Sequence, residues 1–201
     1  NIVMTSLAAS NITAVIGNWV KARGKGIING FDFGNAGEIE RLELDSLNKI
    51  LDDGFIPIFP CIGWSSVGHP YNISSLSLAQ QVAISLNADK LFFLMDSESI
   101  DKNNFSIPEH FALTEEGSVP AMNLEELDEF LALNSQENLS KQKNFIISVL
   151  KKSKEALEKG VTRVHLVDVN VDGVLPCEIF SDLGSGTMIY TSNYGKIREA
   201  S

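Results

Sequence analysis

Three residues near the C-terminal end of this chain have types and a spacing that could bind a small charged molecule. His165 lies near the end of an apolar segment, Glu178 follows thirteen residues later, and Gly184 opens a Gly-x-Gly-Thr turn six residues after that. A carboxylate binds a guanidinium or ammonium group, and the amides of a glycine turn bind a carboxylate. Such a set suits a zwitterionic amino acid with a cationic side chain. On spacing alone the alternative is favoured, in which His165 is a satisfied core residue and Glu178 a solvated helix residue.

The elements that would position these residues can be read from the apolar spacing. Residues 163–168 predict a buried strand, and residues 188–191 predict a final strand. Between them, a turn at 170–173 leads to a short helix that carries Glu178. The clearest helix covers 140–159 and ends at a glycine. The apolar stripe expected to face its core consists of Phe145, Ile146, Val149, Leu150, Ala156 and Leu157.

The rest of the chain alternates predicted strands and helices. Strands are expected at 38–44, 55–63 and 90–95. Helices are expected at 45–53, 77–87 and 122–133. The segment 55–63 is a near-continuous apolar run, so we expect one strand buried on both faces despite its two prolines. The order strand, helix, strand indicates an α/β sheet.

Composition excludes several classes of protein. The chain has 201 residues, enough for a domain with a real core, and a net charge of −10 with only 16 Lys and Arg. Binding to nucleic acid or to a membrane through a polybasic segment is therefore not expected. No apolar run approaches the roughly 20 residues that a membrane span needs. Cys61 and Cys177 are interpreted as reduced core thiols of a cytoplasmic protein, and no metal site is expected from three His and two Cys.

Motifs spread over nearly the whole chain resemble those of N-acetylglutamate synthases and N-acetylglutamate kinases. Five stretches carry the resemblance: Gly17-Asn18-Trp19-Val20 with Gly30-Phe31-Asp32-Phe33, then Gly37-Glu38-Ile39-Glu40-Arg41, then Ile62-Gly63-Trp64-Ser65-Ser66-Val67-Gly68 with Tyr71-Asn72, then Gly160-Val161-Thr162-Arg163-Val164-His165-Leu166-Val167-Asp168, and finally Cys177-Glu178-Ile179-Phe180-Ser181-Asp182-Leu183-Gly184-Ser185-Gly186-Thr187-Met188-Ile189. The family is identified as that of the amino-acid-kinase-like domains. The order and the spacing of these motifs in this chain match those of the family.

This resemblance implies a three-layer α/β/α sandwich with a largely parallel central sheet. The Gly-rich loop that begins the family's domain is not found after Asn1, so we expect a domain that is incomplete at its N-terminus and covers residues 1–195. Residues 196–201 resemble the start of the linker to an acetyltransferase domain. The implied parent is an amino-acid N-acetyltransferase that uses acetyl-CoA, while this chain itself holds no cofactor.

The resemblance also implies site residues. In arginine-sensitive members of the family, L-arginine binds beside the strand and helix matched here, so His165, Glu178 and Gly184 would line an arginine site. Asn72 matches the Asn that holds acetylglutamate in the kinases and is expected to be a vestige of that acyl-amino-acid site. A homo-oligomer is expected as well.

The sequence departs from the kinases where phosphoryl transfer needs charge. Leu76 stands where the kinases have an Asp, and the region around Val149 lacks their Gly-Met pair and Lys. We therefore expect an arginine-sensing regulatory domain with no catalytic residue of its own. Two alternatives stay open: a working N-acetylglutamate kinase, and an oligomerisation platform that binds no ligand.

Overall fold

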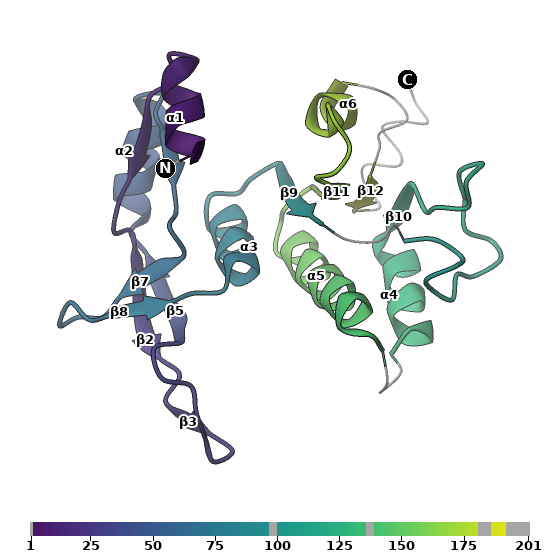
Figure 1. The fold of residues 1–201 in the computed structure, drawn as a ribbon, viewed down its shortest axis with the longest axis horizontal. Helices are drawn as coiled ribbons and strands as arrows, with labels where there is room; N and C mark the ends of the chain where they lie inside the picture. Colours follow the sequence, from purple (N-terminus) through teal and green to yellow (C-terminus); the bar gives the residue numbers. More distant parts are fainter. Residues whose placement is uncertain (1, 97–99, 136–138, 181–185, 192–201) are drawn as a thin grey trace. The chain divides into compact units, whose positions relative to one another are not determined.

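The structure is a computed structural model that describes residues 2–96, 100–135, 139–180 and 186–191. The chain divides into two compact units, residues 1–86 and 87–201, and most of their elements are labelled in Figure 1. None of the helices in the described ranges has the length and apolar character that crossing a membrane requires.

The first unit is built on short strands. Its helices are α1 (Ile2–Ala9), α2 (Leu44–Asp52) and α3 (Ser75–Ser85). Its strands are β1 (Ala14–Ile16), β2 (Val20–Gly24), β3 (Ile27–Ile28), β4 (Phe31–Asp32), β5 (Gly37–Leu42), β6 (Ile56–Ile58), β7 (Ile62–Trp64) and β8 (Pro70–Asn72). A mixed sheet has the order β5-β2-β7-β8, and β1 pairs in parallel with β6. Val20, Ala22, Ile73 and Leu78 form a buried cluster of this unit.

The prediction of one buried strand over residues 55–63 is wrong. The run forms β6 and β7, which belong to different sheets. Cys61 lies between them with a φ of +57°, a left-handed conformation that interrupts an extended strand. Pro60 beside it has no amide hydrogen to offer to a strand ladder. Ile56 is accordingly 41% exposed, because β6 is not covered on both faces.

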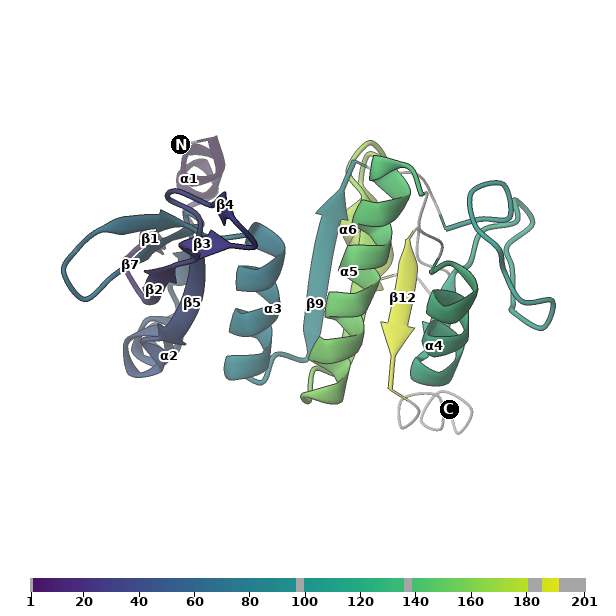
Figure 2. The same cartoon turned by 90° about the horizontal axis from the view of Figure 1, so that it is seen from below.

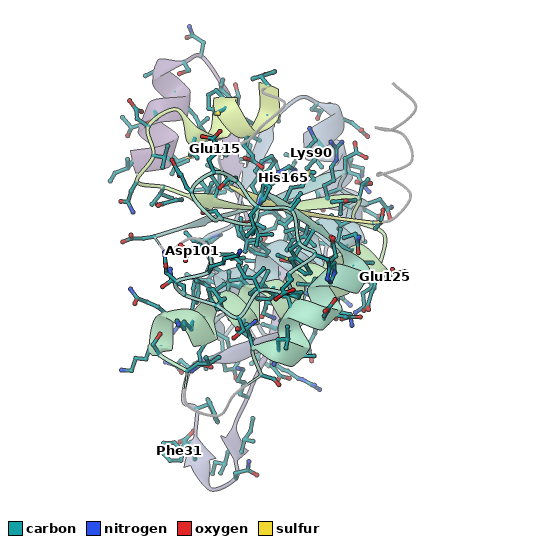
Figure 3. All side chains as sticks on the ribbon, turned by 90° about the vertical axis from the view of Figure 1, so that its right-hand side faces the viewer. Phe31, Lys90, Asp101, Glu115, Glu125 and His165 are labelled. Carbon is teal, nitrogen blue, oxygen red and sulfur yellow. The ribbon has the colours of Figure 1, made fainter. Side chains whose placement is uncertain are left out.

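Residues 25–37 form turns around short strands. β3 and β4 make an antiparallel hairpin, and both Asn29 and Gly30 at its turn have positive φ, as a type I′ turn requires. Phe31 lies near this turn and is 77% exposed (Figure 3).

The second unit contains the sheet that carries the candidate site. Its elements are β9 (Lys90–Met95), β10 (Ala121–Asn123), α4 (Leu124–Leu133), α5 (Lys141–Glu158), β11 (Arg163–Asp168), α6 (Val174–Phe180) and β12 (Thr187–Tyr190). The strand order is β10-β12-β11-β9. β11 runs parallel to β9 and antiparallel to β12, while β10 runs parallel to β12. The predicted α/β class is confirmed.

Helices lie on both faces of this sheet. α4 and α5 cover one face, and α6 lies on the other (Figures 1 and 2). Side chains alternate between the faces of a strand, so Val164 and Leu166 of β11 share one face while His165 points to the face of α6. Within this unit the layers are therefore helix, sheet and helix.

The helices α4 and α5 begin and pack largely as their sequences predict. Asn123 is the N-cap of α4 and forms a capping box with Glu126. Lys154 of α5 pairs with Asp128 of α4, and this hydrogen bond raises the pKa of Lys154. The stripe predicted for α5 is buried except for Phe145, which is 42% exposed, so its assignment to the core is wrong.

Asn134 fastens the long irregular segment before β10 to the end of α4. Its Oδ1 accepts the amide of Ser106 at 3.0 Å, and its Nδ2 donates to the carbonyls of Ser106 at 2.8 Å and Phe130 at 2.9 Å. The side chain is 5% exposed, so water cannot replace these bonds at low cost. The far end of the segment is held by Thr187 of β12, whose hydroxyl donates to the carbonyl of Val119 at 2.7 Å.

We expect Asn134→Ala to lower the free energy of unfolding by about 2 kcal/mol, because it removes three hydrogen bonds made by a buried side chain. Urea denaturation followed by circular dichroism measures this loss. The matched control is Ser135→Ala, whose exposed hydroxyl donates to the carbonyl of Ala132 and whose removal should change stability by less than about 0.5 kcal/mol. Equal effects of the two variants would contradict the role given to Asn134.

Candidate functional site

His165 and Glu178 meet in the interior of the second unit. Nδ1 of His165 lies 2.7 Å from Oε1 of Glu178, and the two residues are 4% and 9% exposed. A carboxylate only accepts hydrogen bonds, so Nδ1 carries the hydrogen and donates. The structure brings these two residues together and buries both, so the alternative is wrong in expecting a solvated Glu178, while His165 is buried in the core as that alternative has it. Figure 3 shows His165 among crowded side chains below α6.

The second oxygen of Glu178 is also used. The amide of Gly186 donates to Oε2 at 3.0 Å. A Cβ at Gly186 would lie 2.2 Å from the carbonyl oxygen of Leu166, so only glycine fits where β12 approaches β11. Gly184, the glycine expected at the site, lies outside the described residues. Gly186 is the second glycine of the Gly-x-Gly-Thr motif, whereas the sequence analysis assigned only the first, Gly184, to the site.

Phe92 is a site residue that sequence analysis missed. It is the register partner of His165 on β9, and the two rings stack with their centroids 4.6 Å apart and an interplanar angle of 13°. Nε2 of His165 is buried, and no described residue offers it a hydrogen bond. Buried polar atoms in folded proteins nearly always have a partner. The candidate site therefore contains a positioned polar atom that a ligand can satisfy.

A second polar group lies where β9 and β11 end. The side-chain amide of Asn170 donates to Oδ1 of Asp96 at 2.8 Å and to Oδ1 of Asp168 at 3.0 Å. Within the described ranges, no group of three His, Cys, Asp or Glu side chains could hold a metal ion.

Asn72 belongs to the first unit. It lies at the end of β8, is exposed, and its backbone amide donates to the carbonyl of Asn35 at 2.8 Å. Leu76, which replaces the Asp of the kinases, is half-buried in the first turn of α3. An aliphatic side chain at this position can neither bind a cation nor orient a phosphate.

The two cysteines are free thiols. Cys61 is partly buried, but Cys177 is exposed, so the expectation of two core thiols is wrong for Cys177. The reason is the geometry of α6, which buries Val174 and Glu178 and turns the intervening residues outward.

Comparison with known proteins identifies the family. The sequence profile of the Amino acid kinase family matches residues 2–168, most of the chain. The chain belongs to the amino acid kinase family. The expected resemblance is thereby confirmed, and solved structures similar to this family member support the same fold.

Relatives of this amino acid kinase family member include acetyltransferases. The amino-acid acetyltransferase of Vibrio cholerae is 34% identical over 197 residues, which cover 98% of this chain and 42% of the relative. The chain thus spans about two fifths of the length of the curated relatives it matches.

Two solved structures of N-acetylglutamate synthase from Neisseria gonorrhoeae are also similar. The complex with coenzyme A and L-arginine is 32% identical with a TM-score of 0.70, covering 89% of this chain and 38% of that chain. The complex with coenzyme A and N-acetylglutamate is 30% identical with a TM-score of 0.75, covering 92% and 39%.

We expect Glu178→Leu to lower the free energy of unfolding by about 3 kcal/mol, because it leaves the Nδ1 hydrogen of His165 buried without an acceptor and removes the bond to the partly buried amide of Gly186. The double variant His165→Phe/Glu178→Leu removes both side-chain partners and should lose less than the sum of the two single variants. Urea denaturation of wild type, both single variants and the double variant measures the coupling, expected at about 1–3 kcal/mol. Strictly additive losses would show that the two side chains do not interact.

Proposed function

We propose that this chain is the arginine-sensing regulatory domain of an N-acetylglutamate synthase, the enzyme that transfers the acetyl group of acetyl-CoA to L-glutamate in the first step of arginine biosynthesis. The observation that carries the proposal is the buried pair of His165 and Glu178, with Nε2 of His165 still unsatisfied among the described residues. The names of the relatives and the arginine-bound synthase of Neisseria gonorrhoeae support it.

The chemistry of the pair fits the ligand. A buried carboxylate is costly unless it is hydrogen-bonded, and Glu178 is held by His165 and by the amide of Gly186. A carboxylate next to an imidazole acceptor attracts a guanidinium or ammonium group. Because Nε2 is buried, a ligand can reach it only after some of the protein that covers this face of β11 has moved aside.

In this proposal the chain performs no chemistry itself. The acetyl transfer, and with it acetyl-CoA, belongs to a separate acetyltransferase domain of the parent, joined through a linker that begins at residues 196–201, which lie outside the described residues. Residues 1–195 then form the regulatory domain of a cytoplasmic homo-oligomer. Arginine acts by binding two assembly states with different affinity.

We expect L-arginine to bind the longest expressible form of the protein, and Glu178→Ala to weaken this binding at least about 30-fold, because the variant removes the acidic partner of a buried pair. Isothermal titration calorimetry gives both affinities. Glu40→Gln is the control for charge: Glu40 is an exposed residue of β5 in the first unit, and the variant should bind as wild type does.

The molecular mass in solution, measured in the same samples with and without arginine, tests whether arginine changes the assembly state of the protein. A change of oligomeric state with arginine agrees with sensing. An oligomer that forms without any arginine binding would contradict the proposal and leave the platform function instead.

The kinase alternative rests on the shared fold and on Asn72, and we expect it to fail. Leu76 removes a charge that phosphoryl transfer needs. With ATP, Mg²⁺ and N-acetylglutamate, the protein should release no ADP above the buffer rate in a coupled assay, with an authentic N-acetylglutamate kinase as the positive control. Turnover that depends on N-acetylglutamate and is lost in Asn72→Ala would establish the kinase.

A further inference from the structure

We infer that Phe92 is a positioning residue for ligand binding: its ring holds the imidazole of His165 so that Nε2 accepts a hydrogen bond from an N–H group of a cationic ligand. This inference rests on the proposed function, which places the ligand at His165 and Glu178. It adds a residue and assigns the class of ligand group that His165 contacts.

The strand pairing fixes Phe92 in place. Parallel register joins Phe92 to His165, so both side chains leave the sheet on the same face. Their rings stack nearly parallel, with an interplanar angle of 13° and centroids 4.6 Å apart. The next residue, Phe93, points to the opposite face, where it is buried at 4% exposure.

Two contacts together define the direction of Nε2. The hydrogen bond to Glu178 fixes one edge of the imidazole, and the Phe92 ring fixes its plane. Either contact alone leaves the ring able to tilt or rotate, because the terminal torsion of histidine is broad. With both, Nε2 has one orientation and is kept from water.

The same geometry selects the ligand group. In the neutral imidazole, Nδ1 donates to Glu178 and Nε2 is the ring atom that can accept. A ligand must therefore offer an N–H donor, and the neighbouring carboxylate favours a positively charged one. Guanidinium and ammonium groups share this chemistry. Agmatine has the guanidinium of arginine without its α-carboxylate, and citrulline has the α-amino acid groups without the guanidinium charge.

The test compares Phe92→Leu, Phe92→Tyr and Phe93→Leu in the longest expressible form of the protein. We expect Phe92→Leu to bind L-arginine about tenfold more weakly in calorimetry, in line with the loss of one ring stack. Phe92→Tyr keeps the ring and should restore the affinity. Phe93→Leu should lower the thermal midpoint while leaving the affinity within about twofold of wild type. Citrulline keeps the α-ammonium, so loss of its binding assigns the guanidinium as the group at Nε2, and citrulline binding with the same dependence on Phe92 as arginine assigns the ammonium. Agmatine keeps both cationic groups, so agmatine binding with the same dependence on Phe92 shows that this contact does not need the α-carboxylate.

A spectroscopic readout separates this inference from the proposed function. The long-range ¹H–¹⁵N spectrum of the imidazoles, with His165 assigned by its loss in His165→Gln, should show one tautomer with the hydrogen on Nδ1 in wild type and in Phe92→Tyr. In Phe92→Leu the signal should broaden or split. Arginine binding by wild type with an unchanged affinity and imidazole spectrum in Phe92→Leu overturns the inference alone. Absence of arginine binding by wild type overturns the proposed function, and the ligand-free imidazole spectra then decide the role of Phe92.

Discussion

The parallel register between β9 and β11 determines where the chemistry of the second unit lies. It pairs Phe92 with His165 and Met95 with Asp168, so an aromatic stack forms within the sheet and polar side chains gather where the strands end. Glu178 completes the site from α6. The chain after β11 turns through a short loop, and this brings α6 over the face of β11 that carries His165. A shift of one residue in this register would move His165 away from Phe92 and turn the buried apolar residues outward.

Local patterns predicted most of the elements. Apolar spacing predicted the ends of α2, α3, α4 and α5 to within a few residues. The N-caps of α4 and α5 are Asn123 and Ser140, polar residues of the types that commonly begin helices. The errors have physical causes that spacing does not contain. Phe145 follows the helical stripe of α5 but lies at its edge, and the run 55–63 reads as one strand until Cys61 takes a left-handed conformation.

The candidate site was predictable only in part. His165 and Glu178 were found because a strand and a helix close in sequence bring them together. Phe92 lies more than seventy residues earlier, and its stack on His165 depends on which strands pair and in which register, which is a property of the whole sheet. Gly186 is defined by the approach of its backbone to Leu166, which no local pattern encodes.

The hydrogen bond between His165 and Glu178 has a consequence for the concentration at which a sensor responds. A ligand that contacts Glu178 competes with bonds that the protein already makes to its own imidazole and to an amide. Its measured affinity is then a difference between new bonds and internal ones. A substitution that changes the strength of the internal bonds therefore shifts the response threshold without any change in the atoms that touch the ligand. The set point of such a sensor can therefore evolve separately from its specificity.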